Sequence, residues 1–120
     1  MGKEKDLPLE VVAAKIAALG VPALVFIVAV GATGLAGAAA ITAALAALGP
    51  GGIVGGIAFL GVAGLISDAV VKFGTDALLT AVIKQLYKEG ETKQSIKDKV
   101  AKYPVSKGLK LKLYDKLENL

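Results

Sequence analysis

The chain has 120 residues, of which 55% are hydrophobic and 20% charged, and its formal net charge is +4. Average soluble domains distribute their charge along the whole chain, whereas this sequence has no charged residue between Lys15 and Asp68. The absence of cysteine and histidine excludes disulfides, thiol nucleophiles and the commonest general base and metal ligand. The composition therefore favours a membrane-associated protein that is not an enzyme and carries no cofactor.

Residues 1–20 are predicted to form an N-terminal amphipathic helix. Asp6 can cap this helix and Pro8 suits its first turn. One helical face collects the apolar residues Leu9, Val12, Ile16 and Leu19. Such a helix lies at a membrane surface or packs against other helices. Lys3 and Lys5 ahead of an apolar stretch also resemble a cleaved signal peptide, but this apolar stretch is far longer than a signal peptide requires.

Residues 21–71 are predicted to form a transmembrane helical hairpin in an all-α protein. The first candidate span is 21–48 and the second is 53–71, and each is uncharged or nearly so over the roughly 20 residues that cross a bilayer. The sequence "GPGG" at 49–52 interrupts both helices and predicts a tight turn. Because the first span is longer than a straight crossing requires, it must tilt, kink or extend beyond the membrane.

Small residues recur at spacings of three and four in both spans. Lipid tails are as apolar as leucine, so helices in a bilayer associate through close backbone approach, which small side chains allow. The residues predicted to lie at such contacts are Ala32, Ala36, Ala40, Ala44, Gly51, Gly52, Gly55, Gly56, Gly61 and Gly64. We expect them to support a homo-oligomer; the alternative is packing within one hairpin.

Residues 72–88 are predicted to continue the second span as an amphipathic helical extension. Asp68, Lys72 and Asp76 recur at every fourth position, so they share one face of a continuous helix. That face is either a solvated stripe or a polar lining of a pore or bundle interior, where charge within a membrane usually marks function.

Residues 89–120 form a lysine-rich tail with two predicted short amphipathic helices. The sequence "KEGET" predicts a hinge before them, Pro104 separates them, and Ser106 can cap the second. The second helix has an apolar stripe of Leu109, Leu113 and Leu117. The lysines expected to bind anionic lipid headgroups or a partner are Lys107, Lys110, Lys112 and Lys116. Without arginine or an aromatic platform, the tail is not expected to bind nucleic acid.

The distribution of lysine also predicts topology. All 14 lysines flank the hairpin and none lies in its turn. Positive residues favour the cytoplasmic side, so an integral membrane protein with both termini in the cytoplasm is expected.

The segments "GAAAITAALAAL", "GPGG" and "IVGGIAFLGVAGL" give the chain a glycine- and alanine-rich core with a glycine-rich break. In these segments the chain resembles the interferon-alpha-inducible small membrane proteins. The resemblance implies a role at an organelle membrane or in cell death, with no catalytic residues. In general design the chain is also similar to phage holins and to the hydrophobic hairpin of pore-forming colicins.

Three hypotheses follow. The first is an oligomer that permeabilises or remodels a membrane. The second is a membrane adaptor whose basic tail recruits a partner or anionic lipid. The third is a helical protein that hides the apolar hairpin inside until it is triggered, which the sequence disfavours because few amphipathic helices are available to cover two apolar spans.

Overall fold

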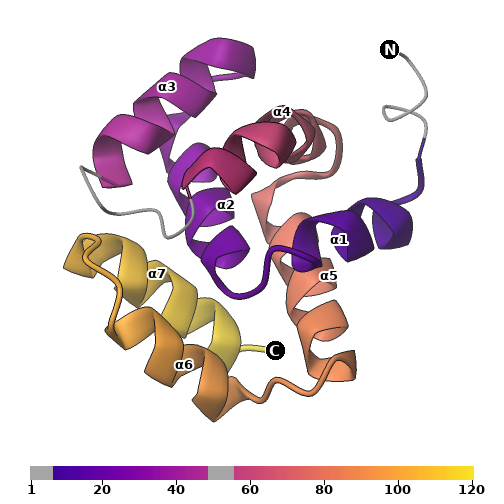
Figure 1. Ribbon diagram of the computed structural model, residues 1–120, viewed down its shortest axis with the longest axis vertical. Helices are drawn as coiled ribbons and strands as arrows, with labels where there is room; N and C mark the ends of the chain where they lie inside the picture. Colours follow the sequence, from indigo (N-terminus) through magenta and orange to yellow (C-terminus); the bar gives the residue numbers. More distant parts are fainter. Residues whose placement is uncertain (1–6, 49–55) are drawn as a thin grey trace.

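The computed structural model describes residues 7–48 and 56–120, and all regular structure in these ranges is helical, which confirms the predicted all-α class (Figure 1). The helices are α1 (Leu9–Ala17), α2 (Pro22–Thr33), α3 (Gly37–Leu48), α4 (Gly56–Phe73), α5 (Thr75–Lys88), α6 (Lys93–Ala101) and α7 (Lys107–Glu118). The predicted "GPGG" turn lies outside the described residues, as do Gly51, Gly52, Gly55 and the predicted cap Asp6.

The segment predicted as one span over 21–48 consists of two helices, α2 and α3, that meet at an angle of 115°. Gly34 ends α2 in the left-handed conformation, with φ of 68°. A residue with a Cβ adopts this conformation only at a cost, so glycine there terminates the helix. The long apolar segment is thus broken by its own sequence, where the prediction was one helix that tilts, kinks or extends beyond the membrane.

A second break separates α4 from α5, where the sequence predicted a continuous helical extension. Gly74 has φ of 89° and lies between Phe73 and Thr75. After this break α5 packs against α1 and α2.

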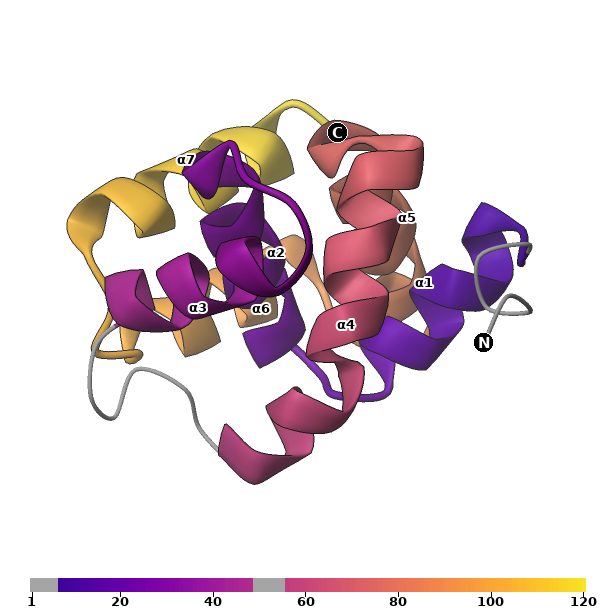
Figure 2. The same cartoon turned by 90° about the horizontal axis from the view of Figure 1, so that it is seen from above.

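The apolar α2 lies at the centre of the molecule, as Figure 2 shows. It packs against α3, α4, α5 and α7. Residues 23–30 of α2 are all buried. The core therefore consists of one enclosed helix with the other helices arranged around it.

The helices around α2 each bury one face, as amphipathic helices do. In α5 the buried residues are Leu78, Leu79, Val82, Ile83 and Leu86. The predicted stripe of α7 is confirmed, since Leu109, Leu113 and Leu117 are all buried. In α6, Ile96 and Val100 are buried.

Side-chain caps fix where α6 and α7 begin. The Thr92 hydroxyl accepts a hydrogen bond from the Ser95 backbone N–H at 3.0 Å, and the Ser95 hydroxyl accepts one from the Thr92 N–H at 2.8 Å. This reciprocal pair is a capping box. Ser106 caps α7, as predicted, by accepting a hydrogen bond from the Leu109 N–H at 3.3 Å.

Among the described residues, no single helix is both long and apolar enough to cross a membrane. Taken together, α2 and residues 37–47 have the necessary length and composition, but they are bent relative to each other.

Candidate functional site

The most unusual feature of the molecule is the enclosure of residues 23–30 of α2. Its sequence "PALVFIVAVGAT" has no charged residue. Leu24, Phe26 and Ile27 have no exposed surface, and Val25 and Val28 are each 5% exposed. A surface helix is apolar on one face, whereas residues 23–30 of α2 are apolar and buried around the whole circumference of the helix.

Enclosure of α2 contributes much of the stability of the molecule. Its large buried side chains are Leu24, Val25, Phe26, Ile27, Val28 and Val30. Burial of each is worth about 1.5–3 kcal/mol, and the six together roughly 9–18 kcal/mol. A whole domain is stable by about 5–15 kcal/mol, so α2 cannot enter water without unfolding the protein. Lipid tails, in contrast, can replace the protein interior around it.

The helices α3 and α4, which both pack against α2, bury small residues. Ala40 and Ala44 of α3 have no exposed surface, and Ala63 and Ala69 of α4 are each 3% exposed. Small side chains let helix backbones approach closely. Part of the predicted packing set thus lies at contacts inside one chain.

The rest of the predicted packing set does not join Ala40 and Ala44. Ala32, Ala36 and Gly64 are exposed. A Cβ added at Gly64 would meet no atom of the described residues within 4 Å. Gly56 and Gly61 lie in the first third of α4. Among the predicted packing residues whose burial the structure describes, Ala40 and Ala44 are therefore internal, and the others are exposed.

The C-terminal end of α2 makes a close contact that the sequence did not reveal. A Cβ added at Gly31 would lie 2.7 Å from the Cγ2 atom of Thr75 and 3.1 Å from its Cβ atom. Thr75 begins α5, directly after the break at Gly74. Only a glycine fits between α2 and α5 without a shift, and no local pattern signals such a long-range contact.

The charges predicted to form one helical stripe lie on two helices. Asp68 and Lys72 belong to α4, Asp76 belongs to α5, and all three are exposed. The Lys72 ammonium donates a hydrogen bond to the Leu7 carbonyl at 3.4 Å and lies 5.1 Å from the centroid of the Phe73 ring.

A cavity of about 410 Å³ lies between α1, the start of α3 and the end of α4. Its lining combines apolar side chains with two charged ones, Asp68 and Lys72. Near it, the buried Ser67 hydroxyl donates a hydrogen bond to the Gly37 carbonyl at 3.4 Å. In the described ranges, no group of three or more His, Cys, Asp or Glu residues could hold a metal ion.

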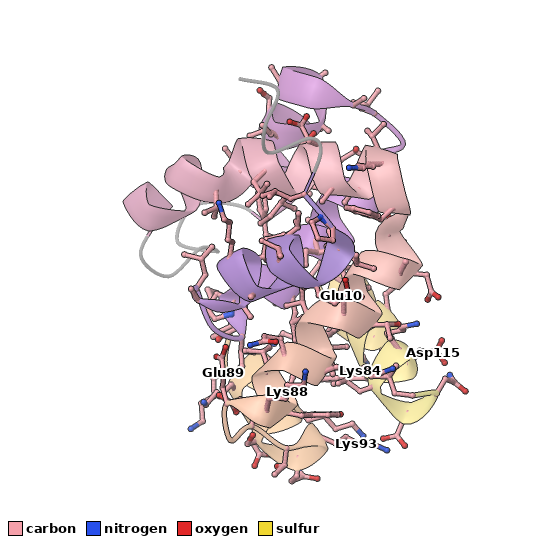
Figure 3. All side chains as sticks on the ribbon, turned by 90° about the vertical axis from the view of Figure 1, so that its right-hand side faces the viewer. Glu10, Lys84, Lys88, Glu89, Lys93 and Asp115 are labelled. Atoms are coloured by element: carbon pink, nitrogen blue, oxygen red, sulfur yellow. The ribbon has the colours of Figure 1, made fainter. Side chains whose placement is uncertain are left out.

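Charged side chains lie on the outside of the molecule. Figure 3 shows Lys84, Lys88 and Glu89 projecting from α5 and the turn after it, with Glu10 on the adjacent α1. Neither α2 nor α3 carries a charged residue. The apolar helices are therefore separated from the charged ones in space as well as in sequence.

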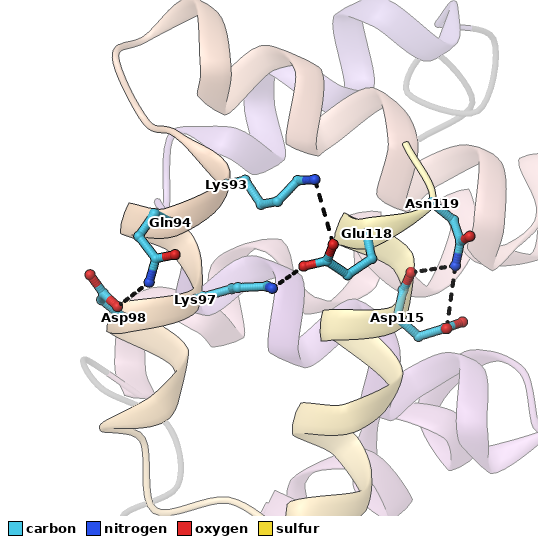
Figure 4. A network of polar contacts seen from close by, with 7 residues as sticks. All are labelled: Lys93, Gln94, Lys97, Asp98, Asp115, Glu118 and Asn119. Carbon is cyan, nitrogen blue, oxygen red and sulfur yellow. Dashed lines mark hydrogen bonds and ion pairs between the residues drawn. The ribbon is translucent and has the colours of Figure 1, made fainter.

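The α6–α7 hairpin, residues 91–119, covers one side of α2, and we call it the covering hairpin. Within it, α6 and α7 pack together, and α7 packs on α2. Figure 4 shows that the Glu118 carboxylate of α7 pairs with Lys93 and Lys97 of α6, with 3.8 Å between the Lys93 ammonium and Glu118 Oε1.

A single side-chain link joins the covering hairpin to the other described helices. Lys116 of α7 and Asp76 of α5 form an ion pair with 2.5 Å between Nζ and Oδ1. The Asp76 side chain is 84% exposed, and exposed ion pairs contribute about 0–1 kcal/mol. Apart from backbone hydrogen bonds at the turn around Gly90, apolar packing provides the remaining attachment.

Ion pairs inside the covering hairpin shift two carboxyl pKa values downward. The hydrogen bond from Lys97, together with the charge of Lys93, lowers the pKa of Glu118. Hydrogen bonds from Lys99 and Ser95 lower the pKa of Glu91. Burial raises the pKa of the Tyr103 hydroxyl.

The predicted lipid-binding lysines divide into two pairs. Lys107 and Lys112 are exposed. Lys110 and Lys116 are partly buried and have partners: Lys110 donates a hydrogen bond to the Ala101 carbonyl at 2.8 Å, and Lys116 pairs with Asp76. The sequence indicated the lysines but not the ion pair between Lys116 of α7 and Asp76 of α5.

No family model, curated protein or solved structure matches this chain. The resemblance to the interferon-alpha-inducible proteins remains a prediction that rests on the quoted segments, and the function has to be inferred from the geometry described above.

Proposed function

We propose that this protein is membrane-active and inserts its apolar helices α2 and α3 into a bilayer, which it then permeabilises or remodels. The observation that carries the proposal is the enclosure of eight consecutive uncharged residues, 23–30, by helices whose charges face outward. The proposal combines two of the sequence hypotheses. The protein hides its apolar helices inside until it is triggered, and after the trigger it permeabilises or remodels a membrane.

The break at Gly34 allows the apolar segment 22–47, which we call the stored segment, to become a membrane-spanning helix. Residues 22–47 would form a helix of about 39 Å if they were continuous, which exceeds the roughly 30 Å hydrocarbon core. Glycine also populates right-handed helical angles, so Gly34 permits the segment to straighten in lipid. A single span would put the two termini on opposite sides of the bilayer. Both lysine-rich termini would lie in the cytoplasm, as positive-inside bias favours, if the second predicted span, 53–71, crosses as well.

A disulfide between α2 and α5 tests the proposal. The chain has no cysteine, and a Cβ at Gly31 would lie 3.1 Å from that of Thr75. Disulfides join Cβ atoms roughly 3.5–4.5 Å apart, so Gly31→Cys with Thr75→Cys needs a shift of only a few tenths of an ångström. We expect the oxidised variant to release little dye from anionic vesicles, and reduction to restore release.

Each single variant, Gly31→Cys and Thr75→Cys, is the control for packing effects and should leak equally with and without reductant. Equal leakage from the oxidised and reduced double variant would overturn the proposal, because α2 would then act without leaving α5.

A basic surface on the covering hairpin favours the second hypothesis, a membrane adaptor. Lys107 and Lys112 are exposed and available to headgroups or to a partner. An adaptor would bind anionic vesicles without releasing their contents, whether or not α2 is cross-linked. Binding without leakage would therefore select the adaptor.

A further inference from the structure

One end of the covering hairpin carries lysine without any acidic residue. Between Asp98 and Asp115 the chain has five lysines and no carboxylate. These are Lys99, Lys102, Lys107, Lys110 and Lys112. Lys99 pairs with Glu91 at 2.5 Å, and Lys110 binds the Ala101 carbonyl. Lys102, Lys107 and Lys112 are exposed, and they form no hydrogen bond or ion pair with another residue that the structure describes.

An exposed apolar side chain lies among these lysines. Leu111 is 54% exposed. It follows Lys107 by four residues, so the two side chains share one face of α7. The buried stripe of α7, which includes Leu109 and Leu113, lies on the opposite face. Lysine around an exposed apolar side chain is the composition of a helix that lies in the headgroup region of an anionic bilayer.

The opposite face of α7 covers α2. The three leucines of the buried stripe are at most 9% exposed, and α7 packs on α2 and α6. Among the described residues, the ion pair between Lys116 and Asp76 is the sole side-chain hydrogen bond or ion pair between the covering hairpin and the other helices. In its first turns the same helix thus presents Lys107 and Leu111 to the outside, with the exposed Asp115 one turn beyond, and it presents an apolar face to α2.

We propose that the exposed surface at this end of the covering hairpin, which carries Lys102, Lys107, Leu111 and Lys112 and which we call the docking face, is the docking site for an anionic lipid bilayer, and that docking there draws α7 away from α2. The inference rests on the proposed function, for which it supplies the partner and the trigger. Nucleic acid fits this surface less well, because it has no arginine and its tyrosines, Tyr103 and Tyr114, are partly buried.

Docking is tested with the full chain and vesicles of phosphatidylcholine with or without phosphatidylglycerol. Each lysine near an anionic surface contributes roughly a fivefold gain in affinity. The triple variant Lys102→Gln, Lys107→Gln, Lys112→Gln should bind anionic vesicles about 100-fold more weakly. Leu111→Ser, tested alone, should also weaken binding.

A matched control removes three exposed lysines elsewhere. The variant Lys15→Gln, Lys84→Gln, Lys88→Gln changes the net charge equally but leaves the docking face intact. It should lose far less affinity than the docking-face variant. Equal losses in the two variants would overturn the site, because binding would then depend on net charge alone. Circular dichroism confirms that each variant remains helical.

Uncovering of α2 is tested with Leu113→Cys, which introduces a single thiol on the buried face of α7. Leu113 is 1% exposed, so a thiol there should react slowly with a maleimide in solution. Anionic vesicles should accelerate labelling at least tenfold, whereas phosphatidylcholine vesicles should not. In the docking-face triple variant the acceleration should disappear. Labelling that anionic vesicles leave unchanged would overturn the coupling between docking and uncovering.

Failure of this inference is distinguishable from failure of the proposed function. If the docking-face variant binds and leaks like the unaltered protein, the inference is wrong and the membrane activity stands. If anionic vesicles accelerate labelling of the Leu113→Cys variant but the unaltered protein releases no dye, the inference stands and permeabilisation is wrong. Tighter binding to polyuridine RNA than to anionic vesicles, lost in the same variant, would reassign the face to nucleic acid and overturn the lipid site.

Discussion

At the residue scale, Gly31 brings the backbone of α2 against Thr75, the first residue of α5. The two positions are far apart in sequence, and nothing local to either one signals the contact. Local features were predictable: Ser106 caps α7 and Leu113 belongs to its buried stripe because both follow from spacing within one helix. Contacts between helices depend on how the chain turns between them.

Replacement of Gly31 by alanine should destabilise the protein. Overpacking a tight contact costs about 1–3 kcal/mol, which outweighs the gain of roughly 1 kcal/mol that alanine brings to a helix interior. We expect a net loss of about 1–2 kcal/mol in urea unfolding. Gly64→Ala is the control, because it faces open space in α4 and should stabilise the protein. A Gly31→Ala variant more stable than the original would refute the close packing.

At the element scale, the helix breaks decide the architecture. The sequence correctly predicted the breaks at "KEGET" and at Pro104. It did not predict that Gly34 and Gly74 end helices, because isolated glycines also occur inside helices and tertiary packing decides between the two. These two breaks divide the long predicted helices into shorter ones, which pack on one another.

The two faces of α3 should respond differently to a larger residue. Ala40 is fully buried against other helices, whereas Ala46 is exposed. Ala40→Leu should cost about 1–3 kcal/mol through overpacking, measured by urea unfolding. Ala46→Leu should leave the stability of the monomer unchanged. If α3 forms chain-to-chain contacts in a membrane, Ala46→Leu should reduce cross-linked oligomers and leakage together. Unchanged oligomers would exclude this face from the association.

Acid should weaken the covering hairpin. The folded-state pKa values of Glu91 and Glu118 are lowered below 4.5 by their lysine partners. Their contribution to stability is therefore present above pH 4.5 and lost as the pH falls through the lowered values. We expect the melting temperature to fall between pH 5 and pH 3, and Glu118→Gln to reduce that pH dependence. A dependence that Glu118→Gln leaves unchanged would assign the effect to other carboxylates.

At the scale of the whole molecule, three helices of low or no charge nest around one another. The sequence argued that too few amphipathic helices were available to cover two apolar spans. In the structure α3 and α4 cover part of α2 themselves, so the amphipathic α5 and α7 need to complete only the remaining sides. A pattern read along one helix cannot show that an apolar helix buries another, because it records composition and not neighbours.

Removal of the covering hairpin should leave a protein that needs lipid. A chain that stops at Gly90 lacks α7 and leaves one side of α2 uncovered. We expect this truncated chain to aggregate when it is made without vesicles and to associate with anionic or neutral vesicles when they are present, as measured by flotation. A truncated chain that remains monomeric without vesicles would show that α7 is dispensable for covering α2.

The position of α7 near the end of the sequence means that α2 is synthesised well before the helix that covers it. The ribosome completes α2 long before α7, because 85 residues separate Thr33 from Glu118. At about 5–20 residues per second, α2 waits roughly 4–17 seconds for its last covering helix. In that interval a nearby bilayer and the unfinished protein interior compete for the same apolar helix. Translation speed and the distance of the ribosome from a membrane thereby become determinants of which destination α2 reaches first.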